Sequence, residues 1–118
     1  MQNIKTDINQ VGTTLRAGDF PIVFLPIILE QGNGIILANT VLGRISISGK
    51  YVPYDEDNFD GSEVARAILK DEGDVTNGDA KAIGMFTGIF NPKVLIGLDQ
   101  KAVSDLMDRS IFMNDVIG

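Results

Sequence analysis

The sequence contains no cysteine, no histidine and no tryptophan. Without cysteine there is no disulfide framework, no thiolate nucleophile and no sulfur-ligated metal site. The lack of histidine removes the commonest general base near neutral pH and the commonest transition-metal ligand, together with the base that activates serine or cysteine in many hydrolases. These absences exclude most familiar hydrolase sites. We therefore expect a protein with no catalytic residue, no metal ligand and no cofactor.

Positive charge is also scarce. The 118 residues include 10 Lys and Arg against 16 Asp and Glu, which gives a formal net charge of -6, and no two basic residues are adjacent. An acidic chain without a basic patch repels the phosphate backbone of nucleic acids. We expect no nucleic-acid partner.

Long apolar runs are absent. The longest covers residues 20–29 and contains Pro21 and Pro26, and the N-terminus lacks the basic cap and apolar stretch of a secretory signal. A run of this length is too short to cross a bilayer as a helix. We expect it to form a buried strand and loop, without membrane contact.

The length fits one domain, which we place at residues 20–118 after a mostly polar arm at residues 1–19. Within the arm, apolar residues follow the spacing of one helix face. The arm alone buries too little apolar surface to fold, so it is either a frayed tail or a segment that becomes ordered on a partner. The apolar positions are Ile4, Ile8, Val11 and Leu15.

Glycine-punctuated, β-branched sequence beyond the arm predicts short strands. The clearest feature is a hairpin that joins residues 41–48 to residues 51–54 through Gly49 and Lys50. Pro53 cannot donate a ladder hydrogen bond, so the second strand should be short or lie at an edge. The turn-like sequence Gly-Asn-Gly at residues 32–34 is a further break between strands.

Two later segments are also predicted to be strands. Residues 64–69 fit a strand, although a helix capped by Ser62 would have the same periodicity. Residues 80–90 should form another strand, broken by Gly84 and Gly88.

One helix is predicted, over residues 100–109. Asp99 is placed to cap it, and Ala102, Val103, Leu106 and Met107 lie on one face. Residues 111–113 then form a last short strand or an apolar plug. The predicted fold class is mainly β with a short C-terminal helix, that is, α+β.

Three partial motifs do not support a ligand site. Gly43 and Gly49-Lys50 are one residue too far apart for a phosphate-binding loop, and Tyr51 replaces its metal-binding Ser or Thr. The turn at residues 32–34 lacks the last glycine of a dinucleotide fingerprint. The acidic loop at residues 55–63 places Ala67 where a calcium loop needs a bidentate Glu. A loose calcium site in that loop stays open as an alternative.

Several short blocks follow one another along the chain: Val41-Leu42-Gly43-Arg44-Ile45, Gly49-Lys50-Tyr51-Val52-Pro53-Tyr54-Asp55, Asp60-Gly61-Ser62-Glu63-Val64-Ala65, Ile68-Leu69, Gly78-Asp79-Ala80-Lys81-Ala82 and Gly88. In their order and spacing these blocks resemble the head decoration protein D family, typified by bacteriophage lambda. They extend over roughly residues 20–111, and together they are fairly specific. The stretch at residues 90–98 is more apolar than the family pattern, and the N-terminus does not match it.

The resemblance implies a compact β-rich fold and a homotrimer that binds the major capsid protein. It places the protein on the outer surface of the phage head, at local three-fold sites of the expanded capsid, after synthesis in the host cytoplasm. An arm that becomes ordered on the shell could pair with a capsid strand. We expect the capsid-binding arm to use Ile4, Lys5, Ile8, Val11 and Leu15, and the trimer interface to use Phe24, Ile27, Phe90 and Leu95.

A second hypothesis belongs to another class. A small β-rich binding module of glycan or adhesin type could use the acidic loop at residues 55–63 with calcium. Saturable calcium or glycan binding would favour that alternative, whereas a decoration protein should show neither.

Overall fold

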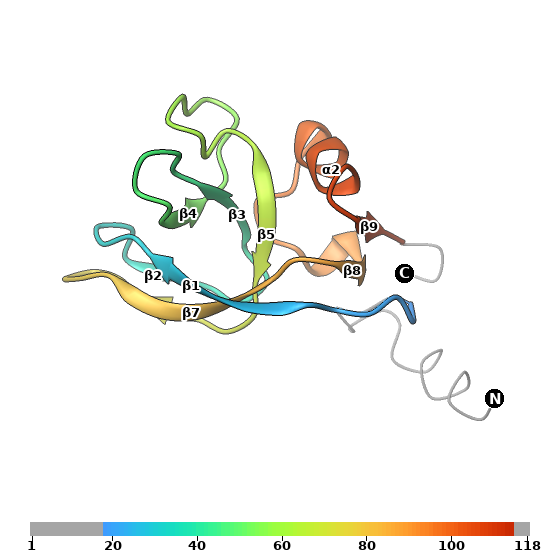
Figure 1. Ribbon diagram of the computed structural model, residues 1–118, viewed down its shortest axis with the longest axis horizontal. Helices are drawn as coiled ribbons and strands as arrows, with labels where there is room; N and C mark the ends of the chain where they lie inside the picture. The colour runs from blue at the N-terminus through green and yellow to red at the C-terminus, as the bar shows by residue number, and fades with distance from the viewer. Residues whose placement is uncertain (1–17, 115–118) are drawn as a thin grey trace.

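The computed structural model describes residues 18–114, and most of its regular structure is short β-strands (Figure 1). The predicted class, mainly β with one short C-terminal helix, is confirmed. The strands are β1 (Phe24–Leu29), β2 (Ile35–Ile36), β3 (Val41–Arg44), β4 (Tyr51–Pro53), β5 (Ala65–Leu69), β6 (Gly73–Asp74), β7 (Ala80–Met85), β8 (Gly88–Phe90) and β9 (Ile111–Met113); the helices are the 3₁₀ turn η1 (Pro92–Val94) and α2 (Gln100–Met107).

Five strands close a small barrel in the order β1-β4-β3-β5-β7. Its closure is uneven, because β1 pairs with β7 over its whole length but with β4 only through Leu29 and Tyr51. Two further sheets have two strands each: antiparallel β2–β6 and parallel β8–β9. Figure 1 shows β1 and β7 as a long ribbon on one side of the molecule, with α2, β8 and β9 gathered at one end.

The predicted hairpin is confirmed as the antiparallel pair β3–β4. The Ile45 N–H donates to the carbonyl of Lys50 (2.8 Å), and Gly49 has φ of 76°, a conformation that favours glycine. Pro53 ends a strand of only three residues, as expected, but β4 lies between β1 and β3 rather than at an edge.

The ambiguous segment at residues 64–69 forms strand β5, not a helix, and it lies between β3 and β7 with four of its five residues buried. The expected break at Gly84 is wrong. Gly84 lies inside β7, and the chain interrupts its strands at residues 86–87 before β8 begins at Gly88. A side chain at Gly84 would meet the Phe86 ring at 2.8 Å, so glycine serves close packing there.

Two clusters of buried side chains form the core. One lies between the barrel and α2 and includes the fully buried Phe90, Leu106 and Ile111. The other fills the barrel around Leu29, Leu42 and further buried residues, among them Tyr51, Leu69 and Val75. Within the described residues, no helix is both long and apolar enough to span a membrane.

Helix α2 begins as predicted. The Asp99 carboxylate accepts a hydrogen bond from the Ala102 N–H (2.7 Å) and another from the hydroxyl of buried Tyr54 (2.9 Å), so one side chain caps the helix and joins it to the barrel. Lys101 and Asp105 form an ion pair one helical turn apart (2.9 Å). Asp105 also accepts from the N–H of Ala65 (3.1 Å), at the start of β5.

Burial and the hydrogen bond to Asp99 raise the pKa of Tyr54 well above its usual value of about 10. A pKa that is higher in the folded state stabilises the fold below about pH 10, and this contribution is lost as the pH rises further. We expect the melting temperature to fall more steeply between about pH 9 and pH 11 in the wild type than in Tyr54→Phe. Thermal melts across that range measure the slopes.

The matched control is Tyr51→Phe, because Tyr51 is also buried and stacks edge-on against Phe86. This variant also removes a buried tyrosine hydroxyl, but it leaves the hydrogen bond between Tyr54 and Asp99 in place. Equal slopes in all three proteins would contradict the role of Tyr54.

Candidate interaction surface

The segment that leads into β1 and the strand itself carry an exposed apolar surface. Its exposed members are Phe20, Val23, Phe24, Leu25 and Ile28. Exposed apolar residues that occur singly are common, but a continuous group of this kind marks an interaction site.

Strand β1 is apolar on both of its faces. On one face Leu25 and Ile27 lie opposite the small residues Gly84 and Ala82 of β7, and the other face carries Phe24, Pro26 and Ile28. A strand of this composition is typical of sheets that are covered on both sides. In the described chain the second face is uncovered, so the surface is suited to a partner.

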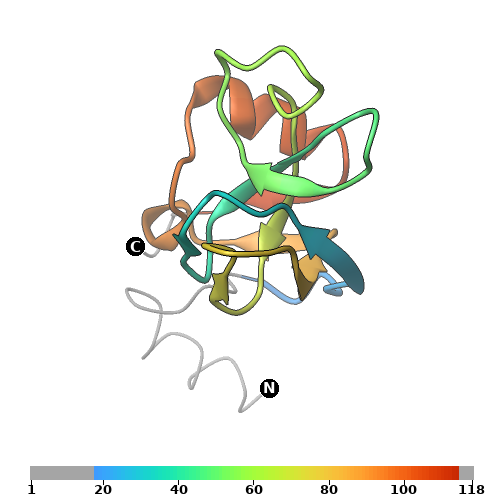
Figure 2. The ribbon, with the colours of Figure 1, turned by 90° about the vertical axis from the view of Figure 1, so that its left-hand side faces the viewer.

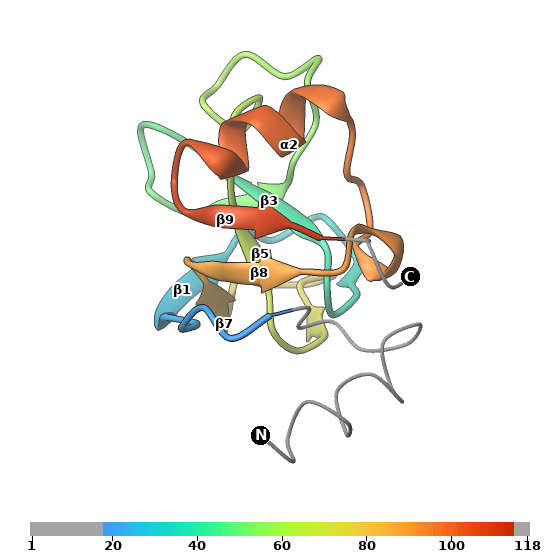
Figure 3. The same ribbon diagram turned by 90° about the vertical axis from the view of Figure 1, so that its right-hand side faces the viewer.

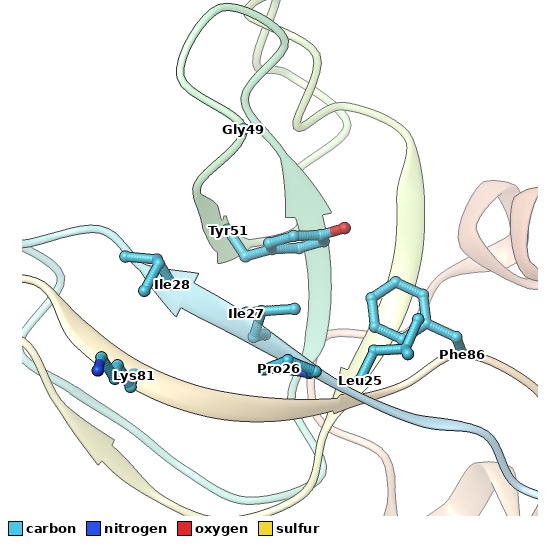
Figure 4. Close-up of a pocket in the computed structure, with 8 residues that line it drawn as sticks. All are labelled: Leu25, Pro26, Ile27, Ile28, Gly49, Tyr51, Lys81 and Phe86. Atoms are coloured by element: carbon cyan, nitrogen blue, oxygen red, sulfur yellow. The ribbon is translucent and has the colours of Figure 1, made fainter.

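A groove of about 540 Å³ runs between β1 and the β3–β4 hairpin, along the seam where the barrel is closed by a single residue pair (Figure 4). We call it the seam groove. Leu25, Ile27 and Phe86 supply much of its apolar wall, and Lys81 is a cation at the rim that forms no ion pair with any described residue. The lining is Leu25, Pro26, Ile27, Ile28, Gly49, Tyr51, Lys81 and Phe86.

An ion pair holds the hairpin side of the groove. Lys50 lies 2.8 Å from Asp79, whose carboxylate also accepts from the backbone N–H of Gln31 (2.8 Å). The hydrogen bond to Asp79 raises the pKa of Lys50, and the same bond lowers the pKa of Asp79. The hairpin loop is thereby tied to the turn before β7, on the far side of the groove.

The open edge of β1 presents backbone groups to this groove. The Phe86 N–H donates to the Val23 carbonyl (2.9 Å), which fixes the alternation of the antiparallel ladder. Val23, Leu25 and Ile27 therefore direct their backbone hydrogen-bonding groups toward β7. Phe24, Pro26 and Ile28, which alternate with them, direct their backbone groups toward the opposite edge of β1. An extended segment could pair there as an added strand.

The structure separates the four residues that the sequence suggested for a trimer interface. Phe24 is exposed on the apolar surface, whereas Ile27 is a nearly buried residue of the groove wall. Phe90 is fully buried in the core of one chain, and Leu95 is half-buried against the same cluster. Leu25 and Ile28, in the same apolar run as Phe24 and Ile27, are also exposed.

The arm residues Ile4, Lys5, Ile8, Val11 and Leu15 lie outside the described residues. The described chain begins beside the β8–β9 sheet, near where it also ends (Figure 3). The ring of Phe20 packs edge-on against Phe112 at 5.7 Å, and the Thr87 hydroxyl donates to the Pro21 carbonyl and accepts from the Val23 N–H. These contacts hold the chain where residues 1–17 would extend from it.

The acidic loop at residues 55–63 is held together by its own side chains. Asp60 accepts from the backbone N–H of Ser62 (3.0 Å), and Glu63 accepts from the N–H of Gly61 (2.8 Å). The hydrogen bonds from Ser62 lower the pKa of Asp60. Within residues 18–114 no three acidic side chains are grouped so that they could hold a metal ion. This geometry gives no support to the calcium-dependent alternative.

Two loops stand side by side at the edge of the molecule (Figure 2). The Ser46 N–H donates to the Asp60 carbonyl (2.8 Å) and so joins the loops. Ile47 and Phe59, one on each loop, are almost entirely exposed.

The family model of the bacteriophage lambda head decoration protein D matches residues 22–111, which include the barrel and α2. The chain belongs to this family. This head decoration protein is therefore a structural component of the virion that binds the phage capsid, sits on its exterior and is not an enzyme. No curated protein sequence matches the chain. The match begins within the segment leading into β1, so it leaves residues 1–21 outside.

Proposed function

We propose that the protein binds the expanded phage capsid as a trimer at local three-fold sites, and that its N-terminal arm makes the capsid contacts that stabilise the head. The observation that carries the trimer is the apolar surface of β1, which is uncovered in a single chain. Covering it between copies would remove apolar side chains such as Phe24 and Leu25 from water.

The position of the first described residues supports the proposed role of the arm. The described chain starts beside β8–β9, where Thr87 and Phe112 hold residues 20–23 in place. Three arms on one trimer would contact the shell together, and joint binding of weak contacts gives an avidity far above that of one arm. The arm contributes Ile4, Ile8, Val11 and Leu15 as apolar contacts and Lys5 as a cation.

Co-sedimentation with expanded, undecorated heads of the source phage tests the proposal. Saturable binding in multiples of three copies, counted by gel densitometry, is expected. If no protein binds to shells that are shown to be expanded, the proposal is wrong.

Deletion of residues 1–15 should leave a folded protein that still trimerises but binds heads at least about tenfold more weakly, because three sets of contacts are lost together. Circular dichroism checks the fold, and the same co-sedimentation measures binding. Replacing Ile4, Ile8, Val11 and Leu15 by Ser should reproduce the loss. Replacing the polar arm residues Asn3, Asn9, Gln10 and Thr14 by Ser is the matched control and should bind normally. Unchanged binding of the deletion would contradict the arm model.

A further inference from the structure

We propose that the seam groove of one copy receives the exposed edge of β2 from a neighbouring copy, so that the copies associate head to tail. This inference rests on the proposed trimer and assigns two unlike surfaces to each of its contacts. It moves the interface away from Phe90, which the core of one chain already buries.

The inserted surface consists of Ile35 and Leu37, which we call the β2 ridge. Their side chains are 57% and 51% exposed, while Ile36 between them is buried. Among the described strands β2 pairs only with β6, so its other edge is open. Ile35 in this open-edged strand and Leu37 directly after it are two large exposed apolar side chains, which form a counterpart to an apolar groove.

The backbone N–H and C=O groups of Ile35 also point toward the open edge of β2. The Val75 N–H donates to the Gly34 carbonyl (2.8 Å), which makes Gly34 and Val75 a hydrogen-bonded pair. The next pair, Ile35 with Asp74, is then of the non-hydrogen-bonded type, so the N–H and C=O of Ile35 point away from β6. They are available to a strand of another copy.

The groove offers complementary backbone groups. On its open edge Phe24 presents both an N–H and a C=O, and Pro26 presents a C=O only. The Ile35 groups could therefore bond at Phe24 while the Ile35 and Leu37 side chains enter the apolar groove. A partner strand that pairs along β1 in this way would cover the seam.

Charge also matches. The groove rim carries the exposed cation Lys81, whereas exposed Asp74 lies on β6 beside the ridge and exposed Glu72 directly precedes that strand. Thr76 donates to the Asp74 carboxylate and lowers its pKa, so this carboxylate stays ionised at neutral pH. Opposite charges at the rim favour one orientation of the two copies.

The contact between groove and ridge is compatible with the proposed trimer. The groove and the ridge are different surfaces, so their contact is heterologous, and such contacts produce a closed ring when the rotation between copies closes. Three copies would use all three grooves and all three ridges, with none left exposed.

Disulfide trapping tests the inference, because the chain has no cysteine of its own. The variant that carries both Leu25→Cys and Ile35→Cys should give covalent trimers on a non-reducing gel, on heads and in concentrated solution. Leu25→Cys alone and Ile35→Cys alone should stay monomeric, since a head-to-tail contact does not bring identical residues together. The pair Phe59→Cys with Ile35→Cys is the control for random collisions, because Phe59 is 95% exposed at a loop tip.

Charge reversal adds a second variant set. Lys81→Glu and Asp74→Lys, each placed in the double-cysteine background, should lower the trapped fraction roughly two- to fivefold, and together they should restore it. Restoration would not occur if either residue acted only within its own chain.

The outcomes separate this inference from the proposed function. Trapped dimers from either single-cysteine variant would indicate a two-fold contact and overturn the inference. Absence of trapped trimers on heads that bind the protein in multiples of three would overturn it while the trimer stands. Failure of the wild type to bind heads concerns the proposed function, because trapping in solution does not require the shell.

Discussion

Phe90→Ala should lower the free energy of unfolding by about 3–5 kcal/mol, the usual cost of removing a fully buried aromatic ring. Phe90 is 0% exposed and belongs to the core cluster that joins the barrel to α2 through Leu106 and Ile111. The substitution leaves a cavity that this small core cannot close without moving the helix. Equilibrium unfolding in urea, followed by circular dichroism, measures the change.

Phe59→Ala is the matched control, because it makes the same chemical change on a side chain that is 95% exposed. Its effect on the free energy of unfolding should stay within about 0.5 kcal/mol. A similar loss for both variants would mean that Phe90 does not hold the core together as described.

Gly43→Ala should destabilise the fold by about 3 kcal/mol, at the upper end of the usual cost of overpacking. A Cβ atom at Gly43 would overlap the carbonyl oxygen of Ser62 and would lie 2.7 Å from its Cα. Both partners are backbone, so no change of side-chain conformation relieves the clash. The register between β3 and β5 also shifts between Leu42 and Gly43. The substitution should therefore disturb the barrel and the acidic loop that leads into β5.

Gly78→Ala provides the comparison. Gly78 has no positive φ, and a Cβ atom there would meet nothing within 4 Å. Unfolding in urea should place this variant within about 0.5 kcal/mol of the wild type, and alanine could stabilise it by reducing the entropy of the unfolded chain. If Gly43→Ala proved equally mild, the close approach of β3 to Ser62 would be contradicted.

Local patterns predicted the elements whose cause is local. The β3–β4 hairpin follows from the turn at Gly49, and α2 follows from the capping carboxylate of Asp99. The break expected at Gly84 failed for the opposite reason. Gly84 pairs with Leu25 of β1 on one side and with Leu69 of β5 on the other, and these distant strands keep it inside β7.

The same limit applies to the interaction surface. Phe24 and Phe90 are the same residue type in similar apolar runs, yet one is exposed on β1 and the other is the centre of a core cluster. Their difference depends on which distant elements cover them. The sequence pattern therefore indicated more apolar residues than one small core requires. It did not identify which of these residues are exposed on the surface.

Composition and the family blocks alone established that this protein has no cysteine and no histidine, that it is mainly β and that it resembles the phage decoration proteins. These properties depend on residue types and on short spacings, which can be read directly from the sequence. The open seam was decided only by tertiary structure, because it arises where β1 meets β4 through the single pair of Leu29 and Tyr51. Pairing between strands more than twenty residues apart leaves no local pattern in the sequence. The groove and the ridge could therefore be identified only from the three-dimensional structure.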